Sequence, residues 1–169
     1  MAEAGAPHFD AAGRAVMVDV GAKPETERVA VARARIALSP EAFTRVAAGE
    51  AGKGDVLGVA RIAGIMAAKR TSELIPLCHA VPLTSVTLRF RLRAPRVEVE
   101  AEARCRARTG VELEALTAAA TACLTIYDMT KAYGRGHLIS DLRLLAKTGG
   151  RSGEWRREGE EPWPTSEVR

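Results

Sequence analysis

The chain has 169 residues, of which 47% are hydrophobic and 27% charged, and it carries a formal net charge of +4. A chain of this length forms one globular domain that buries roughly two-thirds of its unfolded surface, so no second domain is needed. The excess of basic residues suits a protein that binds nucleic acid or a small molecule with several phosphates. The positions of the charges decide between these two ligands.

Both ends of the chain differ in composition from its middle. Residues 1–16 are polar and lack an apolar core, so they are neither a signal peptide nor a membrane span, and we expect a flexible arm. Residues 154–169 are expected to form a flexible tail, and residues 17–153 the single domain. The three cysteines form no CxxC pair, which argues against a disulfide framework or structural zinc and favours a reducing compartment, the cytoplasm.

The first elements are marked by start and stop residues. Small and branched residues alternate with arginines over Val29–Leu38 and predict a strand. Ser39 is expected to cap a short helix that opens on a proline and closes on Gly49. After a glycine-rich joint, Asp55 is the expected N-cap of a second helix that ends near residue 70.

A hairpin is predicted next, with alternating apolar residues on one face of each strand. In the matching register, Arg91 lies opposite Glu98 and Arg89 opposite Glu100, and we expect a solvated, salt-bridged face. Because these arginines are paired with glutamates, the hairpin no longer offers the basic patch that was the best candidate for binding nucleic acid. The chain has only 4% aromatic residues, and Phe90 is the sole one in the hairpin, so the stacking surface of an RNA reader is missing.

Thr109 and Glu112 have the spacing of a capping box, and the helix that they open is expected to run to about Lys131. Residues 115–127 carry no charge and are rich in alanine and threonine, so we expect this helix to be buried on more than one side, in part by a second subunit.

A last strand is predicted over Leu138–Lys147. The order is therefore strand, helices, two strands, helix, strand. This order predicts an α+β fold, an antiparallel sheet with helices packed on one face, of the ferredoxin-like class.

Lysine is scarce, with five residues against twenty arginines. Arginine stays protonated at any working pH, whereas the pKa of lysine moves with its surroundings, so the lysines are candidates for proton transfer. Lys53, between two glycines, resembles a flexible phosphate-reaching lysine, although no Walker spacing surrounds it.

Asp128 and Lys131 are neighbours on the surface of the predicted helix. Lys131 continues an apolar stripe, so we expect a charge aimed along the buried face; the stripe comprises Leu113, Leu116, Ala120, Leu124 and Tyr127. The alternative is an ion pair at the helix end with the lysine reaching into solvent.

His79 lies between two prolines in an apolar loop that we expect to be ordered. It is a candidate either for catalysis or for a structural role. Cys78 beside it lacks a nearby ligand, so no metal site is predicted. Glu112 is explained as a member of the capping box, whereas Glu114 is not.

Together these segments resemble the MoaC family, the cyclic pyranopterin monophosphate synthases of molybdenum cofactor biosynthesis, from about Met17 to Gly153. The matching blocks are Met17-Val18-Asp19-Val20, Lys53-Gly54-Asp55-Val56, Ala60-Arg61-Ile62-Ala63-Gly64-Ile65, Ala67-Ala68-Lys69-Arg70-Thr71, Leu74-Ile75-Pro76-Leu77-Cys78-His79, Thr109-Gly110-Val111-Glu112-Leu113-Glu114-Ala115-Leu116-Thr117, Ile126-Tyr127-Asp128-Met129 and Leu144-Leu145-Ala146-Lys147. Two positions depart from the family pattern: Ala80 stands where a proline commonly follows the histidine, and Leu113 where methionine is usual.

The resemblance implies a ferredoxin-like catalytic domain and a homohexamer built as a trimer of dimers, with active sites at the dimer interface. It also implies a lyase reaction, in which 3′,8-cyclo-7,8-dihydro-GTP is rearranged to cyclic pyranopterin monophosphate with release of diphosphate. The reaction transfers no electron, so we expect no required cofactor, while assistance by Mg²⁺ stays open. Partners are then this small molecule and further copies of the chain, with neither nucleic acid nor membrane.

The resemblance also implies roles for individual residues. Asp128 matches the catalytic acid/base position, and Lys53 and Lys131 match essential lysines. If the site is shared between subunits, these two lysines are expected to come from different chains. The residues that match or are candidates for substrate contacts are Leu77, Cys78, His79, Glu112, Leu113 and Glu114, with Arg28, Lys23, Lys69 and Lys147 as weaker candidates for a phosphate clamp.

Two other interpretations stay open. One is a noncatalytic ferredoxin-like module that binds nucleotide or RNA. The other is a phosphate-cyclising nuclease that uses His79 and Lys131 and accepts RNA as its substrate.

Overall fold

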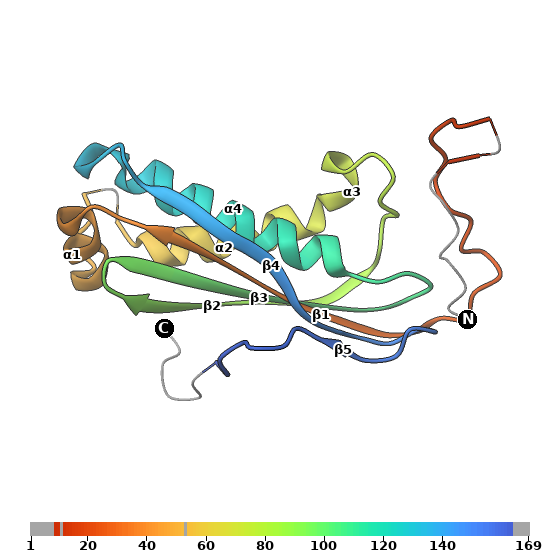
Figure 1. Cartoon of the computed structure of the whole chain (residues 1–169). Helices are drawn as coiled ribbons and strands as arrows, with labels where there is room; N and C mark the ends of the chain where they lie inside the picture. Colours follow the sequence, from red (N-terminus) through yellow and green to blue (C-terminus); the bar gives the residue numbers. More distant parts are fainter. Residues whose placement is uncertain (1–8, 11, 53, 164–169) are drawn as a thin grey trace.

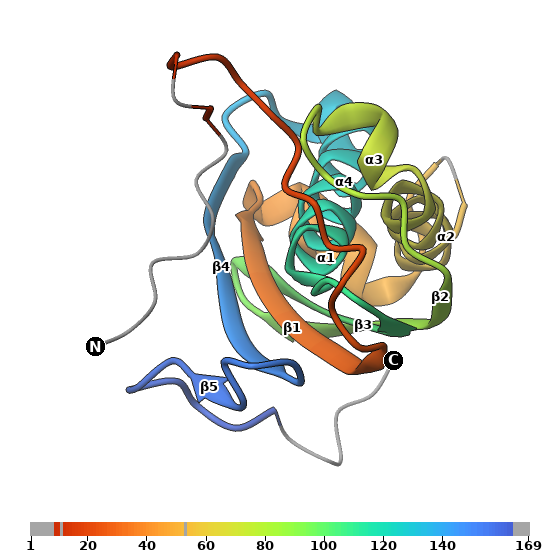
Figure 2. The ribbon, with the colours of Figure 1, turned by 90° about the vertical axis from the view of Figure 1, so that its right-hand side faces the viewer.

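The computed structural model describes residues 9–10, 12–52 and 54–163 and has two layers, a sheet and a set of helices (Figure 1). The elements are β1 (Thr26–Ala37), α1 (Pro40–Ala48), α2 (Val56–Lys69), α3 (Thr71–Leu74), β2 (Leu83–Arg93), β3 (Arg96–Ala107), α4 (Glu112–Thr130), the 3₁₀ helix η1 (Lys131–Tyr133), β4 (Leu138–Thr148) and β5 (Trp155–Arg156). The strands pair antiparallel in the order β2-β3-β1-β4-β5. Helices cover one face only (Figure 2), so the predicted ferredoxin-like class is confirmed.

The predicted helix starts are confirmed where a side chain caps the helix. The Ser39 hydroxyl accepts a hydrogen bond from the amide of Ala42, and Gly49 closes α1 in the left-handed conformation. The Asp55 carboxylate accepts from the amide of Gly58 and caps α2. These caps place the loop between α1 and α2 at one end of the sheet.

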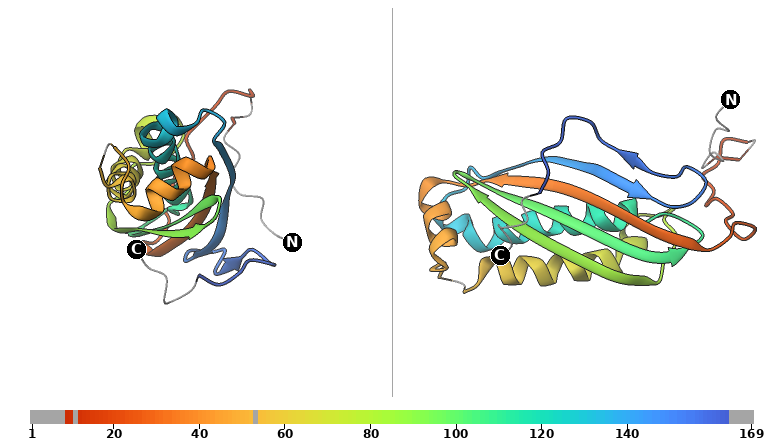
Figure 3. Two further views of the ribbon diagram at one scale, coloured as in Figure 1. Left: turned by 90° about the vertical axis from the view of Figure 1, so that its left-hand side faces the viewer. Right: turned by 90° about the horizontal axis from the view of Figure 1, so that it is seen from below.

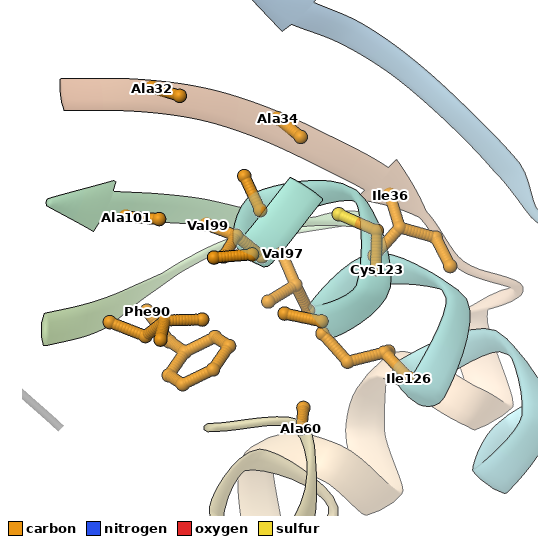
Figure 4. Close-up of a cluster of buried hydrophobic side chains, with 14 of the residues drawn as sticks. Ala32, Ala34, Ile36, Ala60, Phe90, Val97, Val99, Ala101, Cys123 and Ile126 are labelled. Carbon is orange, nitrogen blue, oxygen red and sulfur yellow. The ribbon is translucent and has the colours of Figure 1, made fainter. Parts of the chain in front are cut away.

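The core is built from small side chains, and it fixes how closely the helices approach the sheet. Ala30, Ala32, Ala34 and Ile36 of β1 are fully buried beneath α4. Figure 4 shows side chains of this core between the strands and the helices. At Gly64 of α2, a Cβ atom would lie 2.9 Å from the Ala118 carbonyl oxygen of α4, so glycine is required where these helices cross. This close packing makes α4 a rigid support for groups at both of its ends.

The start of α4 differs from the prediction. The N-cap is Val111 and no side chain caps the helix, so the expected capping box of Thr109 and Glu112 is wrong. The carboxylate of Glu112 instead accepts a hydrogen bond from Lys147 of β4. A cross-element ion pair thus takes the place of a local cap.

The buried face of α4 also differs from the prediction. The buried face consists of Glu114, Ala115, Ala118, Ala119, Ala122, Cys123, Ile126, Met129 and Thr130. In the expected stripe, Leu113 and Leu124 are 38% and 59% exposed, so Lys131 continues an outward face of the single chain. The physical reason is that alanine permits a closer approach of α4 to β1 and α2 than leucine does.

The hairpin register is confirmed, because Arg89 pairs with Glu100 and Arg91 with Glu98. The expected solvation of this face is wrong. Arg33, Arg91 and Glu100 are only 5%, 3% and 6% exposed. The segment that follows β4 runs along this side of the sheet, opposite the helices (Figure 3).

Residues 154–163, for which we expected a flexible tail, make specific contacts with this face. β5 pairs with β4. Glu160 forms ion pairs with Arg143 and Arg33, and the ring of Trp163 lies 5.1 Å from the Arg33 guanidinium and 5.0 Å from that of Arg91. The covered arginines are therefore neutralised and stacked within the chain.

Within the described residues, every helix is too short or too polar to cross a membrane.

Candidate active site

A cavity of about 410 Å³ lies at the end of the molecule where α4 begins. This volume falls within the range of about 300–1,000 Å³ that is typical of small-molecule sites. The cavity is lined by Val18, Val20, Lys23, Ile75, Leu77, Cys78, His79, Thr109, Gly110, Glu112, Leu113 and Glu114. Three separate segments thus bring together the six predicted substrate contacts from residues 77–79 and 112–114, and Lys23 joins them.

Glu114 is the most deeply buried polar group of this wall, with 2% of its surface exposed. Its Oε1 atom accepts a hydrogen bond from the Cys78 thiol at 3.6 Å, while Oε2 is buried and has no hydrogen-bond partner among the described residues. Burial raises the pKa of the Glu114 carboxyl, and the nearby Glu112 charge raises it further. A buried acceptor without a partner is costly, so this oxygen is suited to an N–H or O–H donor of a ligand.

The surroundings of Cys78 disfavour its thiolate form. Burial, followed by the charge of Glu114, raises its pKa to about 11. Since the thiolate is the reactive form, Cys78 here donates a hydrogen bond and shapes the cavity wall.

Glu112 connects the cavity to the sheet. Its Oε1 atom lies 2.9 Å from the Lys147 ammonium. At Gly110, a Cβ atom would lie 1.8 Å from Glu112 Oε2, so the preceding loop requires glycine for this carboxylate to take its position. Lys147 is therefore already paired, and Lys23 is the only lysine or arginine among the described residues that line the cavity.

Sequence reasoning did not select five further lining residues as contacts: Val18, Val20, Ile75, Thr109 and Gly110. All five stand inside the family blocks quoted above, so the signal was present. Their apolar or small side chains carry no reactive group and gave no chemical reason for selection.

Among the described residues, the predicted phosphate-clamp candidates Arg28, Lys69 and Lys147 do not line the cavity. Arg28 donates to the carbonyls of Ala107 and Arg108, beside the cavity rim. Lys69 is exposed at the end of α2. Lys53 lies outside the described residues, and its predicted role stays a prediction.

Asp128 and Lys131 lie at the opposite end of α4, which runs from the α3 side of the molecule to the α1 side (Figure 1). Lys131 Nζ is 2.7 Å from Asp128 Oδ1, and both side chains are more than half exposed, at 54% and 60%. The hydrogen bond to Asp128, and then its charge, raise the pKa of Lys131. Lys131 is therefore a cation at neutral pH.

The distance between the two ends follows from helix geometry. Glu114 and Asp128 are separated by about 21 Å along α4, because each residue advances the helix by about 1.5 Å. A single chain therefore does not bring the cavity and the Asp128–Lys131 pair to one ligand.

No three histidine, cysteine or carboxylate side chains in the described part of the chain lie close enough together to hold a metal ion. The arginine face of the sheet, the surface that an RNA reader would use, is covered by residues 160–163. The geometry thus favours a small-molecule site.

Comparison with known proteins agrees with this geometry. The MoaC family matches residues 17–150. A Thermomicrobium roseum protein named cyclic pyranopterin monophosphate synthase is 59% identical over 156 residues, which span 91% of this chain and 94% of that protein. Proteins of the same name from two strains of Cereibacter sphaeroides are 56% identical over 153 residues, or 89% of this chain and 96% of each relative.

Proposed function

This chain belongs to the MoaC family, and from that premise we propose that it acts as a cyclic pyranopterin monophosphate synthase. It converts 3′,8-cyclo-7,8-dihydro-GTP to cyclic pyranopterin monophosphate and diphosphate, a lyase step of molybdenum cofactor biosynthesis. The observation that carries this assignment is the cavity at the start of α4, whose wall presents the buried, unpartnered Oε2 atom of Glu114. The bicyclic head of the substrate offers the N–H groups that such an acceptor binds.

The reaction has two parts. A C–N bond is hydrolysed and the ring closes again as a pterin; a sugar hydroxyl then attacks the α-phosphorus, and diphosphate leaves. Both parts need proton transfers and neither needs an electron, so we propose that the enzyme requires no redox cofactor. Lys23 at the cavity is suited to the phosphate charge, with Arg28 at its rim.

The Asp128–Lys131 pair is suited to the proton transfers. The hydrogen bond and charge of Asp128 raise the pKa of Lys131, so Lys131 keeps its positive charge and is suited to stabilise phosphate charge. A role for Lys131 as a proton donor is proposed from its match to the family's essential lysine. Asp128, held 2.7 Å away, is then the group that accepts protons. Lys53 is proposed to assist with the phosphate charge.

The separation of the two ends of α4 supports an active site shared between subunits. We propose a homohexamer, a trimer of dimers, in which the Asp128–Lys131 end of one chain faces the cavity of another. The exposed apolar residues Leu113 and Leu124 on the outward face of α4 support such a contact. We propose that the protein works in the cytoplasm. The reason is that Cys78, Cys105 and Cys123 are all free thiols, as is typical of a reducing compartment.

The test is conversion of the purified substrate. The protein is incubated with 3′,8-cyclo-7,8-dihydro-GTP; a fluorescent pterin after oxidation and an equal amount of diphosphate are expected. Consumption of an RNA oligonucleotide with no pterin product would instead support the phosphate-cyclising nuclease and would overturn this assignment.

A further inference from the structure

His137 is a buried histidine at the Lys131 end of α4, with only 8% of its surface exposed. It directly precedes β4 and follows the turn that leaves η1. Its ring packs edge-on against that of Tyr127, with 5.6 Å between the ring centres. A buried polar ring needs hydrogen-bond partners, and these partners show what His137 holds in place.

Both ring nitrogens of His137 have partners whose roles are fixed. The Ser39 amide, 3.3 Å from Nδ1, can only donate a hydrogen bond, so Nδ1 is the acceptor. The Thr130 carbonyl oxygen, 3.3 Å from Nε2, can only accept, so Nε2 carries the hydrogen. The surroundings therefore fit one form of the ring, the neutral imidazole with its hydrogen on Nε2.

The Thr130 carbonyl belongs to the peptide bond that leads into Lys131. It is one of the last carbonyls of α4, which have no donor within the helix. The other side of this peptide bond is also held, because the Lys131 amide donates to the Tyr127 carbonyl. Since a peptide group is planar, bonds to its N–H and to its C=O together fix the backbone from which the Lys131 side chain leaves the helix.

The second partner of His137 is itself firmly held. Ser39 caps α1, and its hydroxyl donates to the Tyr133 carbonyl at 2.7 Å. At Gly134, a Cβ atom would lie 2.9 Å from Ser39 Oγ and 3.4 Å from His137 Cε1, so glycine permits this close approach. His137 thus connects the start of α1 to the end of α4 across a tightly packed turn.

We propose that His137 is a positioning residue for the synthase reaction, an inference that rests on the proposed function. By donating to the Thr130 carbonyl, it orients the peptide bond that carries Lys131, and with it the ammonium that lies 2.7 Å from Asp128. His137 is not a catalytic residue, because its ring is buried while both of those side chains are more than half exposed. The bond to Ser39 holds the ring, and the bond to Thr130 acts on Lys131.

Two amide variants separate these two bonds. In His137→Gln, the side-chain amide reaches the place of Nε2 and donates to Thr130, but the Ser39 amide loses its acceptor. In His137→Asn, the shorter side chain accepts from Ser39 in place of Nδ1 but does not reach Thr130. Each variant keeps one hydrogen bond and loses the other, so both are expected to lower the midpoint of thermal unfolding by a similar amount.

The kcat values distinguish positioning from a merely structural role. His137→Gln is expected to keep kcat within about twofold of the wild type, whereas His137→Asn is expected to lower it by about tenfold. A structural role would lower kcat equally in both variants, in step with their stability. Equal kcat values for the two variants, or a lower value for His137→Gln, would overturn the inference.

Two further measurements do not need turnover. Nitrogen NMR of the wild type at pH 8 is expected to show His137 with a protonated Nε2 and an unprotonated Nδ1. Hydrogen exchange of the Lys131 amide is expected to be about fivefold faster in His137→Asn than in His137→Gln. The opposite tautomer, or equal exchange, would overturn the inference. If the wild type converts no substrate, the proposed function fails, whereas these two results still report whether His137 holds the Lys131 backbone.

Discussion

Glu114 and Asp128 lie at opposite ends of the same rigid helix, one buried in the wall of a cavity and the other exposed beside Lys131. Because α4 separates them by about 21 Å, a substrate that contacts both must lie between two chains. We therefore propose that the active site has two halves, which come from two different chains. The cavity half contains residues 77–79 and 112–114, and the helix-end half contains Asp128 and Lys131.

This division predicts which inactive variants complement one another. Mixed oligomers of Glu114→Gln and Lys131→Ala are expected to recover activity, because one interface then pairs an intact cavity with an intact helix end. The subunits are exchanged by coexpression, and pterin formation is measured on purified mixed oligomers.

The control mixture is Asp128→Asn with Lys131→Ala. Both changes lie in the same half, so no interface regains an intact site and no recovery is expected. Recovery in the control mixture would contradict the division.

Asp128→Asn is expected to lower kcat by about 10²–10⁴-fold, the usual loss when a proton-transfer group is removed. The side chain keeps its size, so the midpoint of thermal unfolding should stay within a few degrees. The pH profile of kcat should also lose the limb that reports the proton acceptor. An unchanged rate and profile would remove Asp128 from the mechanism.

The Cys78 thiol is expected to resist alkylation. With its pKa raised to about 11, the thiolate at pH 8 is about two orders of magnitude less populated than in an ordinary cysteine. Iodoacetamide labelling of the native protein, read by mass spectrometry, should be correspondingly slow. Glu114→Gln should speed it only in part, because burial is the larger cause of the shift. Labelling at the rate of a free cysteine would show that the thiol is not held in this environment.

Glu114→Gln should stabilise the ligand-free protein while reducing its activity. Burial raises the pKa of Glu114 in the folded state, so between the unfolded and folded pKa values the folded protein binds the extra proton. The stability of the wild type therefore falls as the pH rises through that window, and the variant lacks this loss. The difference in unfolding midpoint, variant minus wild type, should be larger at pH 8 than at pH 4.5. A difference independent of pH would exclude this linkage.

Trp163→Ala is expected to lower the free energy of unfolding by about 1–3 kcal/mol, because it removes the ring that stacks on two buried guanidinium groups. Urea unfolding measures the change. Trp155→Ala is the control: that ring is 40% exposed and has one guanidinium 5.7 Å away, so a loss of at most about 0.5 kcal/mol is expected. Equal losses would mean that Trp163 does not hold the tail on the sheet.

Local patterns predicted the elements whose causes are local. The Ser39 and Asp55 side chains bond amides three residues away, and the hairpin register follows from alternation over a short turn. The inward face of α4 could not be predicted in this way. Periodicity separates two faces of a helix, but the distance to β1 and α2 decides that the alanine face, and not Leu113 and Leu124, is buried.

Composition alone could not predict contacts between residues that are far apart in the sequence. A polar segment rich in glutamate and proline is typical of a flexible tail, yet Glu160 and Trp163 find partners on β1, β2 and β4. The bond between Gly52 and Tyr133 likewise joins residues 81 positions apart. For the site, the family blocks contain the cavity residues other than Lys23, while the separation of the cavity from Asp128 and Lys131 became visible only from the direction of α4.

The covering of the sheet by its own tail sets an order of events during synthesis. Glu160 follows Arg33 by 127 residues, which a ribosome adds in about 6–25 seconds at about 5–20 residues per second. During this interval the strands can pair, but Arg33 and Arg91 lack their covering partners and must stay hydrated. The charged face can therefore become dry only after the rest of the sheet has been made, so the final docking of Trp163 marks the completion of the subunit.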